Sequence, residues 1–151
     1  MKKFVLYFIP VVVCLSVGVT SGELQGEALR VWYPGLVKSS LTPPPVVFPV
    51  AWSIIYVLVG ISLGCVLECV NKRMVLIWAA QLFVNFAWSV LFFVLRSPVA
   101  GLVDIVILDF LVAWYLYVGF RSCRKAAWLF VPYMAWLLFA TYLNWVVVIC
   151  N

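Results

Sequence analysis

The stretch from Met74 to Leu95 reads MVLIWAAQLFVNFAWSVLFFVL and contains no charged residue. A helix that crosses the hydrocarbon core of a bilayer needs about 20 predominantly apolar residues, so this stretch is long enough to span a membrane. Four further apolar runs flank it, at approximately 4–20, 46–70, 99–120 and 126–149. We therefore predict an all-α integral membrane protein, in which a single domain over residues 1–151 forms a bundle of five transmembrane helices.

The composition of the whole chain also indicates a lipid environment. Hydrophobic residues make up 68% of the 151 residues and charged residues only 10%, whereas a soluble domain is about half apolar and about one-quarter charged. The chain has no histidine, which excludes Ser-His-Asp catalysis and histidine-ligated zinc or haem. We expect no metal site and no resident cofactor. The five cysteines lack metal-ligand spacing, and we expect free buried thiols and not a disulfide framework.

The basic residues are scattered, so the net charge of +5 does not indicate nucleic-acid binding. We interpret them as topology signals. In a five-span bundle, one side carries Lys2, Lys3, Lys72, Arg73, Arg121, Arg124 and Lys125, and the other carries Arg30, Lys38 and Arg96. Because Lys and Arg accumulate in cytoplasmic loops, we predict a cytoplasmic N-terminus. The first run also resembles a signal peptide, but a good small-residue cleavage site is missing, which favours a retained helix.

The connections between the predicted spans differ greatly in length. Those at 71–73, 96–98 and 121–125 are very short, so consecutive helices must be antiparallel neighbours. The first loop, at about 21–45, is long and contains aromatic residues and the run Pro43-Pro44-Pro45. Three consecutive prolines stiffen the backbone, which favours a packed lid over the outer end of the bundle rather than an ordinary solvated linker.

A few polar or small residues inside the predicted spans have two interpretations each. Asp104 and Asp109 form either a proton or cation site, or structural carboxylates bonded to neighbouring helices. Gly60 and Gly64 form a GxxxG pair, which marks either close helix packing within the chain or a dimer face. Asn85 together with deep tryptophans has the composition of a site for a flat, largely apolar ligand.

Three stretches of the sequence resemble one known family. They run from Trp32-Tyr33 through Pro43-Pro44 to Val47-Phe48-Pro49-Val50-Ala51-Trp52, over residues 81–93, and from Val131-Pro132-Tyr133 through Trp136 to Trp145. In their order and spacing they resemble the translocator protein family, also called tryptophan-rich sensory proteins and formerly the peripheral-type benzodiazepine receptor. The resemblance implies five transmembrane helices with a ligand cavity that the first loop closes.

The resemblance also implies a ligand class and a set of binding residues. Family members bind porphyrins such as protoporphyrin IX, together with isoquinoline carboxamide and benzodiazepine ligands, and they often form dimers. The candidate ligand-binding residues are Trp32, Phe48, Trp52, Asn85, Trp88, Trp136 and Ala140. The sequence departs from the family pattern at Lys38-Ser39-Ser40-Leu41, where the usual proline and tryptophan are missing. It also has no basic residue after Tyr142, so we do not expect specific sterol binding.

Three functions follow as hypotheses. The leading one is a membrane receptor or carrier for porphyrin-like ligands, located in a bacterial inner membrane. The enzymatic alternative is light- or oxygen-dependent porphyrin degradation, with Trp52 and Trp136 as the candidate catalytic residues. The third is a small proton-coupled transporter that uses Asp104 and Asp109. The expected partners are the tetrapyrrole ligand and the lipid bilayer, with a second copy of the chain as a further candidate and nucleic acid excluded.

Overall fold

The computed structural model describes residues 2–151, and the regular elements in this range are all helical. The long helices are α1 (Lys2–Val31), α2 (Val47–Glu68), α3 (Lys72–Ser89), α4 (Pro98–Ser122) and α5 (Arg124–Cys150). A short 3₁₀ helix, η1 (Tyr33–Gly35), follows α1, and a π-helix, η2 (Val90–Val94), continues α3. Each long helix, with η2 counted as part of α3, is long and apolar enough to cross a membrane. The predicted fold class is confirmed.

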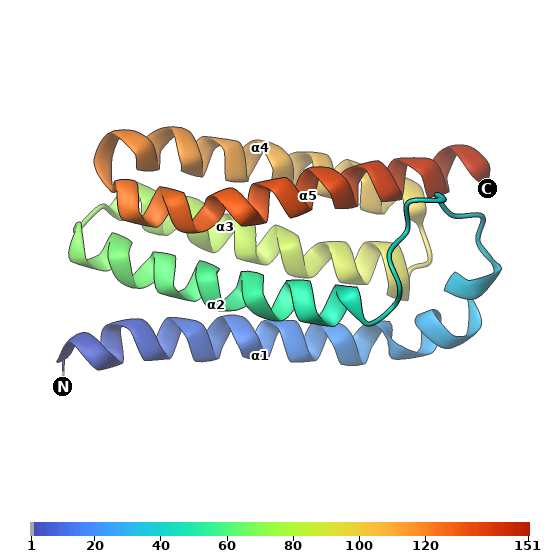
Figure 1. The fold of residues 1–151 in the computed structure, drawn as a ribbon, viewed down its shortest axis with the longest axis horizontal. Helices are drawn as coiled ribbons and strands as arrows, with labels where there is room; N and C mark the ends of the chain where they lie inside the picture. The colour runs from blue at the N-terminus through green and yellow to red at the C-terminus, as the bar shows by residue number, and fades with distance from the viewer. Residues whose placement is uncertain (1) are drawn as a thin grey trace.

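The five helices run up and down along one common direction (Figure 1). Helix α1 packs on α2, α2 packs on α5, and α4 packs on both α3 and α5. The two ends of the chain lie at opposite ends of the bundle. The side chain of Asn71 caps the start of α3 and that of Ser97 caps the start of α4, so each of these helices begins directly after a short connection.

The first helix is longer than its apolar run, and the expected boundary at residue 20 is wrong. Helix α1 continues to Val31, so much of the expected loop at 21–45 is helical. The extension contains Glu, Gln, Ala, Leu and Arg, which are good helix formers even though they are not lipid-like. Its polar side chains reach the end of α3 and the connection between η2 and α4: Gln25 donates to Ser89 at 2.8 Å, and Glu27 pairs with Arg96 at 3.1 Å.

The cysteines do not all stay free, which corrects the expectation of thiols only. Cys69 and Cys123 form a disulfide, with their Cα atoms 6.3 Å apart. Cys69 ends α2, and Cys123 lies between α4 and α5. The antiparallel order brings these two connections to the same end of the bundle, although 54 positions separate them in sequence. Cys14, Cys65 and Cys150 are free.

Gly60 and Gly64 serve packing within the chain. A Cβ atom added at Gly60 would lie 2.5 Å from the Cα of Val11, and one added at Gly64 would overlap the ring of Tyr7. Both contacts are with α1, which therefore approaches α2 closely along this stripe. Of the two interpretations of the GxxxG pair, close packing between α1 and α2 is the one that the contacts support.

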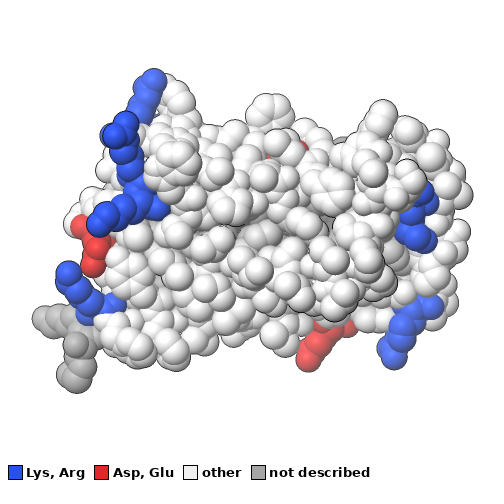
Figure 2. All heavy atoms as spheres, in the orientation of Figure 1, with Lys and Arg blue, Asp and Glu red and all other residues white. Residues whose placement is uncertain are grey.

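Charged side chains are concentrated at the two ends of the bundle. Figure 2 shows Lys and Arg gathered mainly at the end where the chain begins, with a largely uncharged surface between the ends. That end, which we call the basic end, carries the α2–α3 and α4–α5 connections with Lys72, Arg73, Arg121, Arg124 and Lys125. The lid and the C-terminus lie at the opposite end.

Candidate functional site

A chain of buried hydrogen bonds joins three helices at Asn85. The hydroxyl of Tyr56 on α2 donates to Oδ1 of Asn85 on α3 at 2.8 Å. Nδ2 of Asn85 donates in turn to the hydroxyl of Tyr133 on α5 at 3.0 Å. All three side chains are buried. Asn85 is a predicted ligand-binding residue, but both polar ends of its amide already have protein partners.

Aromatic rings from α2 and α5 pack beside this chain of hydrogen bonds. The ring of Trp52 lies 5.7 Å from that of Tyr56 and 6.2 Å from that of Tyr133, and Phe48 packs edge-on against Trp136 at 5.9 Å. Phe48, Trp52 and Tyr56 follow each other at four-residue intervals, so they share one face of α2. These distances are typical of favourable aromatic pairs.

Trp136 contributes a buried hydrogen-bond donor to this group. Its Nε1 is buried and has no hydrogen-bond partner within the described part of the chain. Ala140 lies four residues further on, on the same face of α5, and is partly buried. The structure therefore brings together five of the predicted residues, which we call the indole site: Phe48, Trp52, Asn85, Trp136 and Ala140.

Trp32 and Trp88 belong to a second group at the lid end. Trp88 stacks on Phe92 at 5.0 Å, and Trp32 packs edge-on against the same ring at 5.7 Å. The indole N–H of Trp88 donates to Oδ1 of Asn144 at 3.0 Å, and Asn144 in turn donates to the carbonyl of Pro98 at 2.8 Å. These two tryptophans thus hold the lid and the end of α3 together, and Trp88 also packs against the main core cluster, as Trp136 does.

The connection from α1 to α2 folds back on itself and on α5. Nζ of Lys38 donates to the carbonyls of Tyr33 at 3.0 Å and Leu36 at 2.9 Å. Val37 exchanges two hydrogen bonds with the side chain of Asn151, at 2.9 and 3.0 Å. Burial raises the pKa of the Tyr33 hydroxyl above its usual value of 10.0. These contacts fit the prediction of a packed lid. The ammonium group of Lys38 is hydrogen-bonded to carbonyls of the lid itself.

The two aspartates on α4 have different surroundings. Asp109 accepts a hydrogen bond from Thr141 of α5 at 2.9 Å through one oxygen. Its other oxygen is buried, as is one oxygen of Asp104, and neither has a partner among residues 2–151. The contact with Thr141 ties α4 to α5, as the structural interpretation of Asp109 requires.

The sequence points to Asn85 as a site residue but does not reveal the two tyrosines to which its side chain is hydrogen-bonded. Tyr133 lies in one of the three family stretches, but neither Tyr133 nor Tyr56 is among the predicted ligand-binding residues. A periodicity signal was present, because Phe48, Trp52 and Tyr56 recur every four residues.

Two hollows of the surface lie away from the indole site. One, of about 600 Å³, lies between α1 and α3 and includes Ser16 and Phe83, and the other, of about 290 Å³, lies beside the α2–α3 connection.

Comparison with known proteins gives a consistent result over most of the chain. Residues 10–149 match the model of the TspO/MBR family. The chain is 37% identical over 141 residues to the tryptophan-rich protein TspO of Archaeoglobus fulgidus, with 91% of each chain covered. It is 37% identical over 146 residues to protein CrtK of Rhodobacter capsulatus, covering 93% of this chain and 88% of that one. It is 34% identical over 135 residues to the human translocator protein, covering 85% and 79%.

Proposed function

This chain belongs to the TspO/MBR family, and from that premise we propose that it is a membrane receptor or carrier for porphyrin-like tetrapyrroles. Isoquinoline carboxamide or benzodiazepine-type molecules are the synthetic ligands of the same site. The ligand binds at the indole site, between α2, α3 and α5. The helices supply apolar walls, and the two indoles supply flat faces for a conjugated ring system.

The unpartnered indole N–H of Trp136 is the observation that carries this proposal. A buried N–H without an acceptor costs free energy that a bound acceptor recovers. A carboxylate or carbonyl oxygen on a flat ligand is such an acceptor, and the ring of Phe48 beside Trp136 offers an apolar surface to the rest of the molecule. The absence of histidine from the chain favours metal-free porphyrin, because binding then depends on shape, stacking and hydrogen bonds.

Asn85 has an indirect role in this proposal. Its amide is fully used by Tyr56 and Tyr133, and the ring of Trp52 packs on both of these tyrosines. The hydrogen-bonded chain therefore fixes the angle at which Trp52 faces the ligand. Asn85 positions the wall, while Trp136 makes the polar contact.

The test is a titration of protoporphyrin IX into the purified protein, followed by quenching of tryptophan fluorescence. Trp136→Phe keeps an aromatic ring and removes the N–H, so we expect binding to weaken about fivefold, the equivalent of one hydrogen bond of about 1 kcal/mol. Ala140→Thr should weaken binding by crowding the same face. The matched control is Trp145→Phe, on the same helix but exposed on the outer surface. Equal affinities of wild type, Trp52→Phe and Trp136→Phe would place the ligand elsewhere.

A further inference from the structure

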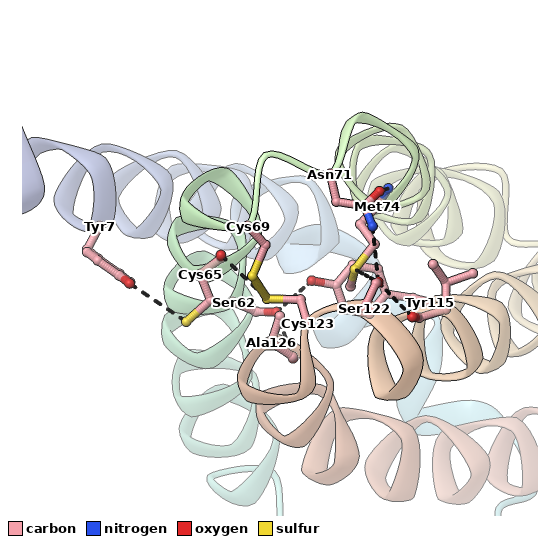
Figure 3. The surroundings of a disulfide bond; sticks show 11 residues. Tyr7, Ser62, Cys65, Cys69, Asn71, Met74, Tyr115, Ser122, Cys123 and Ala126 are labelled. Atoms are coloured by element: carbon pink, nitrogen blue, oxygen red, sulfur yellow. Dashed lines mark hydrogen bonds between the residues drawn. A yellow bond between two sulfur atoms is a disulfide. The ribbon is translucent and has the colours of Figure 1, made fainter.

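The Cys69–Cys123 disulfide, drawn with its neighbours in Figure 3, joins the two connections at the basic end of the bundle and includes no residue of the indole site. It joins the end of α2 to the junction of α4 and α5, and a hydrogen bond from Asn71 to Ser122 at 3.0 Å runs beside it. Both links connect the α2–α3 turn to the α4–α5 turn. Cys65 lies one helical turn before Cys69, but its Sγ points toward Tyr7 on α1, so the pair is distinct from this third thiol.

The two cysteines differ in accessibility. Cys69 is exposed next to the polar connection at Asn71 and Lys72, whereas Cys123 is only 4% exposed. Cys69 is therefore the side of the disulfide from which a soluble reagent approaches. An incoming thiolate must approach one sulfur of a disulfide closely to react with it, and this asymmetry sets the order of attack.

The residue after Cys69 is held in an unfavourable conformation. Val70 has a φ of 51°, in the left-handed region that a β-branched residue rarely adopts. The α2–α3 turn closes there through bonds from Val70 to the carbonyl of Leu67 at 3.3 Å and from Asn71 to that of Val66 at 3.4 Å. The disulfide is thus attached directly beside a residue with a strained backbone.

The charge distribution predicts which compartment this disulfide faces. The end that carries it is the one with most Lys and Arg residues, and the positive-inside rule places such an end in the cytoplasm. Thiol reductants keep cytosolic cysteines reduced, and the disulfides found there are usually transient and catalytic or redox-sensing. A permanent structural cross-link would be expected on the opposite, outer face.

We propose that Cys69 and Cys123 form a reversible thiol–disulfide site, which exchanges electrons with soluble protein dithiols at the basic end of the bundle. A thiolate of the reductant attacks Sγ of Cys69, the Sγ–Sγ bond breaks, and Cys123 leaves as a thiolate that takes up a proton. The second thiol of the reductant then attacks the mixed disulfide and releases Cys69. The reductant is oxidised to a disulfide, and the pair gains two electrons and two protons. Oxidised glutathione reverses the reaction.

The experiment counts thiols in the full chain, reconstituted in lipid vesicles with the basic end outward. A thioredoxin-type dithiol protein, its reductase and NADPH are added, the reaction is quenched with acid, and all free thiols are labelled with a maleimide after denaturation. Three labels are expected before reduction and five after it. Removal of the reductant and addition of oxidised glutathione should return the count to three.

Single variants give the controls. Cys65→Ser removes the neighbouring thiol and should show the same gain of two labels, with one label fewer throughout. Cys69→Ser and Cys123→Ser should each carry four labels whether or not the reductant is present. Because labelling follows denaturation, these counts do not depend on how well a variant folds. Any of three wild-type results overturns the proposal. The count stays at three after the reductant is added, it already equals five before any reductant is added, or it does not return to three with oxidised glutathione.

Discussion

At the scale of single residues, Asn85 connects more of the bundle than any other predicted site residue. Replacement by alanine leaves the buried hydroxyls of Tyr56 and Tyr133 without their shared partner. We expect Asn85→Ala to lower the free energy of unfolding by about 1–3 kcal/mol, measured as a loss of thermal stability in detergent. Tyr56→Phe and Tyr133→Phe each remove one bond and should cost less. Tyr117→Phe, exposed on α4, is the control; equal stability of Asn85→Ala and this control would contradict the assigned role.

The residues of the site could be found from the sequence, but their contacts could not. Trp52, Asn85 and Trp136 are conspicuous because polar and amphipathic side chains are unusual inside apolar runs. Which group bonds to which depends on how each helix is rotated about its axis, and a run that is hydrophobic on all sides does not specify that rotation. For this reason the sequence grouped Trp88 with Trp136, whereas the fold bonds its indole to Asn144 at the lid end.

At the scale of helices, contact between α1 and α2 depends on a glycine. A side chain at Gly60 would meet the backbone of Val11, which cannot move aside as the end of a side chain could. We expect Gly60→Ala to force the helices apart and to destabilise the protein by roughly 1–3 kcal/mol. Gly22→Ala is the matched control on α1, where an added Cβ meets nothing, and helix propensity there predicts a gain of roughly 0.5–1 kcal/mol.

Thermal unfolding in detergent at two protein concentrations distinguishes the two meanings of the GxxxG pair. If Gly60 acts within the chain, the loss of stability is the same at both concentrations. A loss that appears only at the higher concentration, with unchanged stability of the monomer, would indicate a dimer face instead.

The sequence predicted the number and order of the helices well and their ends less well. Apolar runs mark where a helix lies in lipid, but they do not mark where it stops. Helix α1 extends to Val31 because its polar residues still favour helix and gain partners at Ser89 and Arg96. The π-helix Val90–Val94 contains an extra residue in its turn, and the N–H of Leu95 donates to the carbonyl of Val90 at 2.9 Å. A hydropathy pattern does not reveal such a turn.

At the scale of the whole molecule, the uneven distribution of basic residues predicts the orientation in the membrane. Cys150 is free, exposed and at the far end of the bundle from Cys69. With the basic end in the cytoplasm, a membrane-impermeant maleimide added to intact bacterial cells should label the wild-type chain at Cys150, and Cys150→Ser should abolish that signal. After lysis and reduction, Cys69 should become labelled as well. The opposite orientation predicts the reverse pattern. Cys69 would then be labelled in intact cells treated with a reductant, Cys150 would be labelled only after lysis, and the disulfide would lie outside the cytoplasm.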